Sequence, residues 1–173
     1  MEWKKIYSIT HPSSRGKEGF FKDQADAKNR NAQDESADLF SILDQLEEYR
    51  LCSGDFHFKL CYPELEQNYS FPCNEWTQFN NPVLDSLISN YKPINITFQS
   101  ETADFQGLSM SARGKADNLI DDYPYFQLGR SFSVGTIKGK DGKIAGPGGI
   151  LVEKVELFVN PGQLKIKVQA AAL

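Results

Sequence analysis

Short runs of alternating apolar and polar side chains recur along the chain, and this alternation predicts β-strands with one buried face. In the run DFHFKLCY, residues 55–62, the apolar side chains Phe56, Phe58 and Leu60 alternate with His57, Lys59 and Cys61. Similar alternation or strand-like apolar content predicts further strands at residues 3–10, 93–99, 125–134, 151–159 and 164–168. The second half of the chain is therefore expected to be mainly β.

Helical spacing replaces this alternation between residues 38 and 50. Apolar side chains recur there every three or four positions and acidic ones take the opposite face, while Ser36 stands where an N-cap is expected. The pattern predicts an α-helix over 38–50. A second stretch, 20–31, is irregular with some helical character.

These elements predict one domain over residues 1–169 with a mainly β fold, an antiparallel, jelly-roll-like β-sandwich with one α-helix from the N-terminal half packed against it. Turn signals occur at Asn81-Pro82, at Asp141-Gly142 and at residues 146–149 (GPGG). We find no internal repeat and no linker that would divide the chain.

Composition agrees with a globular domain, with 173 residues, 40% hydrophobic and 24% charged. The formal net charge of -4 is small, and the acidic residues are scattered along the chain. The sequence therefore lacks the electrostatic pattern expected of a protein that binds nucleic acid or an anionic membrane. No apolar run approaches the roughly 20 residues of a transmembrane segment.

Secretion is expected from the ends of the sequence. The start, MEWKKIYSIT, lacks the apolar region of a signal peptide, so the protein is either cytosolic or a mature domain whose signal was removed. Residues 170–173 (AAAL) look like a linker left by an expression vector, which favours a mature extracellular domain.

The three cysteines, Cys52, Cys61 and Cys73, cluster in one short stretch. One disulfide with a leftover thiol is favoured over three free thiols of a cytosolic protein, because free cysteines are usually scattered through cores. A zinc site is weaker, since no close cysteine pair is present and only His57 lies nearby.

No catalytic motif survives inspection. The glycine-rich stretch 135–149 matches neither a phosphate-binding loop nor a dinucleotide fingerprint, and a hairpin explains it better. His11 precedes a proline in a turn and His57 faces outward from a strand, so both are expected to be surface residues rather than catalytic bases. The protein is therefore not expected to be an enzyme, and no cofactor is expected beyond calcium.

Two kinds of surface site are suggested by short motifs. Asp121 and Asp122 could bind calcium if loop carbonyls completed the shell, although turn capping is the favoured interpretation. Asn68-Tyr69-Ser70 and Asn95-Ile96-Thr97 are acceptor sequons for N-glycosylation and are compatible with secretion.

Several segments, taken in order, carry a family resemblance: EWKKIY, LFSILDQLEEYR, FHFKLCYPEL, CNEWTQFNNP, YKPINITF, LIDD and GPGGILVEKVELFV. From Trp3 to Val159 this order resembles a secreted domain of unknown mechanism found in corals and sea anemones, including proteins of the coral skeletal organic matrix. The resemblance implies an extracellular setting and a binding or structural role, without a reaction. After LIDD, where related domains look tryptophan-rich, this chain has YPYFQLGRSFSVG.

The same resemblance implies that Cys61 and Cys73 form the disulfide and that Cys52 is the odd thiol. A loop of about a dozen residues closed in this way would remove about 3 kcal/mol of unfolded-chain entropy.

Trp76 lies in a polar segment, residues 73–82, that is expected to run between two strands. One interpretation is that its ring anchors this segment on the sandwich. The other is that the ring is exposed and stacks on a sugar whose hydroxyls bind the neighbouring polar side chains, Asn74, Glu75, Gln78 and Asn80.

We therefore expect a secreted, non-catalytic module that binds a glycan or an extracellular matrix partner. A structural protein of a matrix assembly and a hydrolase without a recognised signature are the alternatives.

Overall fold

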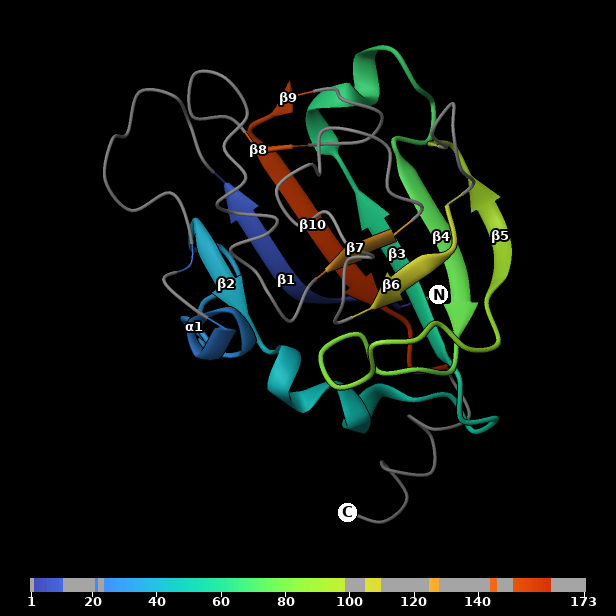
Figure 1. Ribbon diagram of the computed structural model, residues 1–173. Coiled ribbons are helices and arrows are strands. Elements are labelled where there is room, and N and C mark those ends of the chain that lie inside the picture. Colours follow the sequence, from blue (N-terminus) through green and yellow to red (C-terminus); the bar gives the residue numbers. More distant parts are fainter. Residues whose placement is uncertain are drawn as a thin grey trace.

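One antiparallel six-stranded β-sheet forms the centre of the fold (Figure 1). The computed structural model describes residues 2–10, 21, 24–98, 105–109, 125–127, 144–145 and 151–162. Its elements, with η for a 3-10 helix, are β1 (Lys4–Thr10), α1 (Gln24–Lys28), β2 (Leu39–Ser41), η1 (Leu43–Tyr49), β3 (Phe56–Cys61), η2 (Pro63–Gln67), β4 (Cys73–Gln78), β5 (Lys92–Ile96), β6 (Gly107–Ser109), β7 (Tyr125–Gln127), β8 (Ile144–Ala145), β9 (Leu151–Val152) and β10 (Lys154–Val159). The predicted mainly β fold is confirmed.

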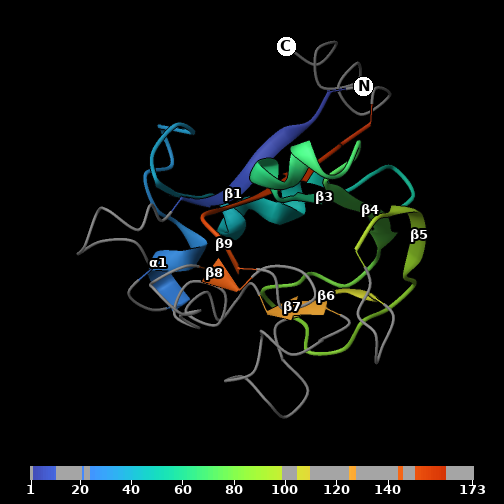
Figure 2. The same cartoon turned by 90° about the horizontal axis from the view of Figure 1, so that it is seen from above.

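The last strand, β10, lies inside the sheet rather than at its edge. The strand order is β2-β1-β10-β3-β4-β5, and every neighbouring pair is antiparallel. Two small pairs lie apart from this sheet, β6 with β7 in parallel and β8 with β9 antiparallel. Figure 2 shows α1, β6, β7 and β8 on the same side of the sheet.

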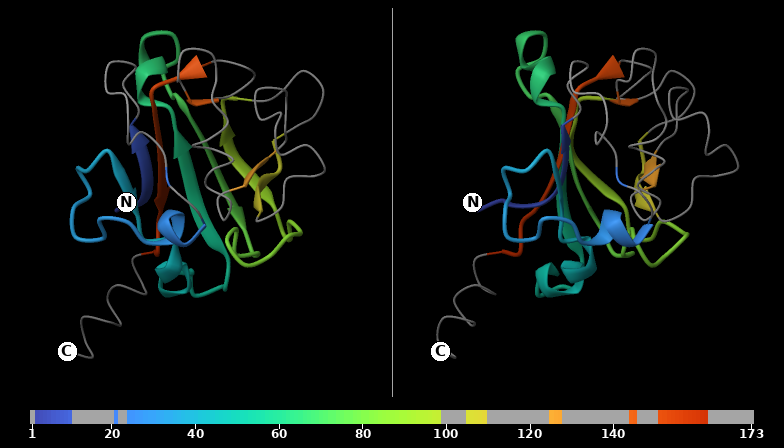
Figure 3. Two further views of the ribbon diagram at one scale, coloured as in Figure 1. Left: turned by 60° about the vertical axis from the view of Figure 1, so that its left-hand side comes forward. Right: turned by 90° about the vertical axis from the view of Figure 1, so that its left-hand side faces the viewer.

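The sheet has two chemically different sides, which we call the core face and the outer face. In β3 the apolar residues Phe56, Phe58 and Leu60 are buried, whereas His57 and Lys59 are only half-buried. Because successive residues of a strand point to opposite sides, the apolar set defines the core face and the other two residues the outer face. Figure 3 shows the sheet nearly edge-on in its right panel, with α1, β6 and β7 on the core face.

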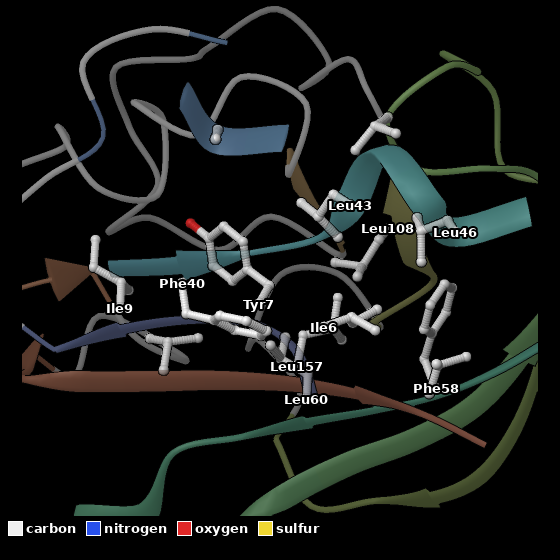
Figure 4. Packing of buried hydrophobic residues seen from close by; sticks show 14 of the residues in the cluster. Ile6, Tyr7, Ile9, Phe40, Leu43, Leu46, Phe58, Leu60, Leu108 and Leu157 are labelled. Atoms are coloured by element: carbon white, nitrogen blue, oxygen red, sulfur yellow. The ribbon is translucent and has the colours of Figure 1, made fainter. Parts of the chain in front are cut away.

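Side chains from several elements meet on the core face. In Figure 4, Leu43 and Leu46 of η1 and Leu108 of β6 lie over Ile6 and Phe58 of the sheet. All of these side chains are buried. Removing each from water contributes about 1.5–3 kcal/mol relative to leaving it exposed, so this layer is a main source of stability.

The α-helix predicted over residues 38–50 is only partly correct. Leu39–Ser41 form the strand β2, which pairs with β1, and Leu43–Tyr49 form a 3-10 helix rather than an α-helix. All three residues of β2 are buried, so their apolar pattern fits a strand as well as a helix. Backbone hydrogen bonding to β1 makes residues 39–41 a strand, and the local sequence pattern does not reveal this partner.

Ser36 does not cap a helix, since its hydroxyl and its backbone N–H both bind the side chain of Asp34. The helical character of residues 20–31 is confirmed in its centre, where α1 is found. No helix among the described residues combines the length and apolar content that a membrane span would need.

Most of the predicted strands are present. The predicted strands at residues 3–10 and 55–62 contain β1 and β3, the one at 93–99 overlaps β5, and residues 151–159 contain β9 and β10. β4 was missed, because its polar side chains suggested a segment between strands. The predictions for residues 128–134, 141–142, 146–149 and 164–168 fall outside the part of the chain that the structure describes.

Candidate functional site

Trp76 is fully buried on the core face of β4. Its ring contacts Phe58, with centroids 5.6 Å apart, and meets Phe105 edge-on at 4.8 Å. The indole N–H donates to Oε1 of Gln78 at 2.7 Å. Neither ring face is therefore open to a sugar, and of the two interpretations of Trp76 the structure shows the anchor in the core.

Gln78 and Asn80 join β4 to β6. Oε1 of Gln78 also accepts from the backbone N–H of Leu108 at 2.9 Å, and its Nε2 donates to the carbonyls of Leu108 and Asn80 at 2.9 and 3.0 Å. Asn80 donates a second bond to the Leu108 carbonyl. These buried amides are satisfied by protein groups, which is how polar side chains are accommodated in a core.

Asn74 extends the backbone pairing beyond β5. Its Nδ2 donates to the carbonyl of Phe98 at 2.9 Å, and its Oδ1 accepts from the N–H of the same residue at 2.8 Å. The expectation that Trp76, Asn74, Gln78 and Asn80 contact a ligand is thus corrected, because β4 turns the first three into the core and Asn80, just after β4, is buried as well. The fifth expected ligand residue, Glu75, lies on the outer face.

On the outer face, Lys59 lies between two aromatic rings. Its Nζ is 4.6 Å from the ring centroid of Trp3 and 5.0 Å from that of Phe158. The pKa of Lys59 is lowered because partial burial desolvates the ammonium, while the nearby charges of Glu75 and Glu156 oppose this shift. No residue that the structure describes accepts a hydrogen bond from this ammonium or forms an ion pair with it.

Glu75 pairs with His57 beside this lysine. Nε2 of His57 and Oε2 of Glu75 are 2.7 Å apart, and the two side chains are 12% and 16% exposed. The imidazole also meets the Trp3 ring edge-on, with centroids 4.8 Å apart. His57 faces outward from its strand as predicted. The only hydrogen bond of its imidazole among the described residues is to this carboxylate, so no described hydroxyl or thiol is bound to the ring.

An ion pair lies on the same face, at β1 and β10. Nζ of Lys5 is 2.7 Å from Oε2 of Glu156, and both side chains are largely buried. The outer face therefore combines aromatic rings, the Lys59 ammonium without an acceptor among the described residues, and carboxylates held by partners. We define the outer-face site as Trp3, His57, Lys59, Glu75 and Phe158.

The disulfide Cys61–Cys73 is confirmed. The two residues are directly opposite each other in β3 and β4, with Cα atoms 4.1 Å apart and a sequence separation of 12. Both are buried. Cys52 is free and exposed, as the resemblance implied.

Asp121, Asp122 and His11 lie outside the residues that the structure describes, so the calcium prediction stays a prediction. Within the described ranges, no three His, Cys, Asp or Glu side chains are grouped so that they could hold a metal ion.

Sequence reasoning missed Trp3, Lys59 and Phe158 as a group. Alternation in β3 already placed Lys59 outward, but the approach of Trp3 and Phe158 depends on the pairing of β3 with β10 and of β10 with β1. Comparison with known proteins adds no further candidate, since no family model, curated protein or solved structure matches the chain.

Proposed function

We propose that the protein is a secreted, non-catalytic binding module that recognises a glycan through the outer-face site. The observation that carries this proposal is the Lys59 ammonium, which lies near the rings of Trp3 and Phe158 and has no acceptor among the residues that the structure describes. Such an ammonium, partly stripped of water, gains from a ligand oxygen that accepts its hydrogen bonds.

The chemistry of the site suits a sugar better than a purely apolar ligand. Sugars present C–H patches, which pack on aromatic rings, and hydroxyls, which need donors and acceptors nearby. Trp3 is half-buried and so offers part of its ring surface. Lys59 supplies donors and Glu75 supplies an acceptor, and both stand on paired strands that hold their positions.

An extracellular setting is supported by the Cys61–Cys73 disulfide, because such bonds persist mainly in oxidising compartments. The resemblance to the domain of corals and sea anemones agrees with this setting and stays a prediction. The β-sandwich is likewise part of the proposal. β6, which is bonded to Gln78 on the core face, would belong to its second layer.

A structural role in a matrix assembly is the second candidate. The loop between β4 and β5 exposes three large apolar side chains, Phe79 at 51%, Leu84 at 61% and Leu87 at 72%. Clustered exposed apolar groups often mark protein contacts. Self-association at neutral pH without calcium, measured by sedimentation, would favour this role. A hydrolase gains no such support, since no described aspartate or glutamate is fully buried.

A glycan array, run with and without calcium, tests the proposal. We expect binding that falls about tenfold or more in Trp3→Ala and in Lys59→Met, because about 1.4 kcal/mol of ring packing or hydrogen bonding is lost. Lys59→Met keeps the apolar stem between the rings and removes only the charge.

Two matched variants should bind like the parent protein. Phe79→Ala removes an exposed ring outside the site, and Lys28→Ala removes a lysine of α1. Absence of binding under both conditions, or equal binding by Trp3→Ala, would contradict the proposal. Binding lost only on chelation would bring Asp121 and Asp122 into the site.

A further inference from the structure

The two N-glycosylation sequons lie next to each other on the surface. Asn68 follows η2 and Asn95 lies on β5, an edge strand of the sheet, and both residues are exposed. The ring of Tyr69 meets that of Phe98 edge-on, with centroids 4.9 Å apart. The hydroxyl of Thr97 donates to the carbonyl of Phe71 at 2.7 Å. The segments that carry the sequons are thus in direct contact.

These two asparagines differ from the others that the structure describes. Neither Asn68 nor Asn95 uses its side-chain amide in a hydrogen bond with another described residue. Every other described asparagine does: Asn29, Asn31, Asn74, Asn80, Asn81, Asn90 and Asn160. A group attached to Nδ2 of Asn68 or Asn95 would therefore displace no side-chain hydrogen bond among the described residues.

We propose that Asn68 and Asn95 both carry N-linked oligosaccharides, an inference that rests on the secretory part of the proposed function. The donor is an oligosaccharide linked to a lipid pyrophosphate. In the transfer, a bond forms between Nδ2 of asparagine and C1 of the first sugar, and the bond between C1 and the phosphate oxygen breaks. The amide loses one proton and the lipid pyrophosphate leaves.

The positions also indicate what the oligosaccharides do. Tyr69 and Ile94, the neighbours of the two asparagines, are 37% and 54% exposed. β5 is an edge strand, and edge strands can pair with another chain. Bulky hydrophilic groups at Asn68 and Asn95 cover both apolar side chains and this edge.

Expression behind a cleavable signal peptide in a eukaryotic secretory host tests the inference. The intact mass of the secreted protein is measured before and after peptide N-glycosidase treatment, which also converts each glycosylated asparagine to aspartate. We expect two occupied sites. Asn68→Gln and Asn95→Gln should each lose one oligosaccharide, and the double variant should lose both and self-associate more strongly in sedimentation.

Further variants separate the sequon from the asparagine itself. Ser70→Ala should abolish modification of Asn68, while Ser70→Thr should keep it. Asn29→Gln, an exposed asparagine outside a sequon, should leave the mass of the carbohydrate unchanged. If the secreted protein has the mass of the bare polypeptide, the inference is overturned. If only one of Asn68 and Asn95 is occupied, the inference is overturned for the unoccupied site. The glycan array that tests the proposed function uses bacterial protein, which lacks these oligosaccharides. Absence of binding on the array can therefore be told apart from absence of glycosylation in the secreted protein.

Discussion

Gln78 and Tyr7 are both fully buried, but their polar atoms are satisfied to different degrees. The amide of Gln78 binds Trp76, Leu108 and Asn80. The hydroxyl of Tyr7, labelled in Figure 4, has no hydrogen-bond partner among the described residues. Burying an unpaired hydroxyl costs about 1–3 kcal/mol, so Tyr7 is a point of local destabilisation within a well-packed core.

Tyr7→Phe should therefore leave stability unchanged or raise it by about 1 kcal/mol, because it removes the unpaired group and keeps the ring. Urea unfolding at neutral pH measures the difference. A loss of about 1 kcal/mol or more would mean that the hydroxyl has a stabilising partner.

The same substitution should change the alkaline limb of the stability profile. Burial raises the pKa of Tyr7 well above its ordinary value of 10.0, because the phenolate would be desolvated. Because the pKa of Tyr7 is raised in the folded protein, the unfolded chain loses the Tyr7 proton at a lower pH than the folded protein does. The contribution of this difference to the free energy of unfolding is therefore complete below pH 10.0 and falls as pH rises above it. Tyr7→Phe should make this decline less steep. An identical decline in both proteins would contradict the assignment.

Among the elements, β6 depends on one glycine for its contact with β4. Gly107 has φ +96°, and a Cβ there would lie 2.6 Å from Oε1 of Gln78 and 3.2 Å from Nε1 of Trp76. A side chain would thus separate β6 from the amide that holds it. The polar residues of β4 and this glycine look like loop residues in the sequence, and only their mutual contact gives them a place in the core.

Gly107→Ala should destabilise the protein more than Gly54→Ala, which is a matched control. Both glycines have φ +96°, but a Cβ at Gly54 would meet only the Phe79 ring, at 3.5 Å. We expect about 1–2 kcal/mol for the backbone strain that both share, and about 1–3 kcal/mol more at Gly107 for the displaced contact. Denaturant midpoints give the comparison. Equal losses would show that β6 moves without cost.

For the whole molecule, the sheet closes only when β10 enters between β1 and β3. β10 lies far from both β1 and β3 in the sequence. Pairing with them therefore costs the entropy of closing a long loop before the strand contacts can stabilise the sheet. The Cys61–Cys73 bond acts on a much shorter loop and fixes β3 against β4.

Loss of this disulfide should lower the free energy of unfolding by about 3 kcal/mol, since the unfolded chain regains the entropy of the loop. The variant with Cys61→Ser and Cys73→Ser, compared with Cys52→Ala as control, measures this in denaturant. In the unfolded, unreduced parent protein, alkylation should find one thiol, Cys52. Three reactive thiols would contradict the bond.

Sequence patterns predicted the site only in part. Alternation in β3 correctly placed His57 and Lys59 on one face, and Glu75 lies on that outer face, whereas the Trp76 that it was expected to flank lies in the core. The polar residues around Trp76 were the only sequence signal for its location. Such residues occur both in a surface segment and in a buried strand whose side-chain amides are hydrogen-bonded inside the core, so the sequence does not distinguish the two. Trp3 and Phe158 are separated by most of the chain, so their approach to Lys59 leaves no local signal.

The sequence by itself determined the mainly β character, the positions of β1, β3, β5 and β10, and the sequons, because each depends on neighbouring residues and a period of two. The cysteine pair was reached through the resemblance. Only the tertiary structure decided that residues 39–41 pair with β1, that β4 is a strand with Trp76 inside, and that Lys59 lies between two rings. These depend on which backbone and side-chain groups become partners across long sequence distances, and hydrogen bonding to such partners changes the cost of burying a polar residue.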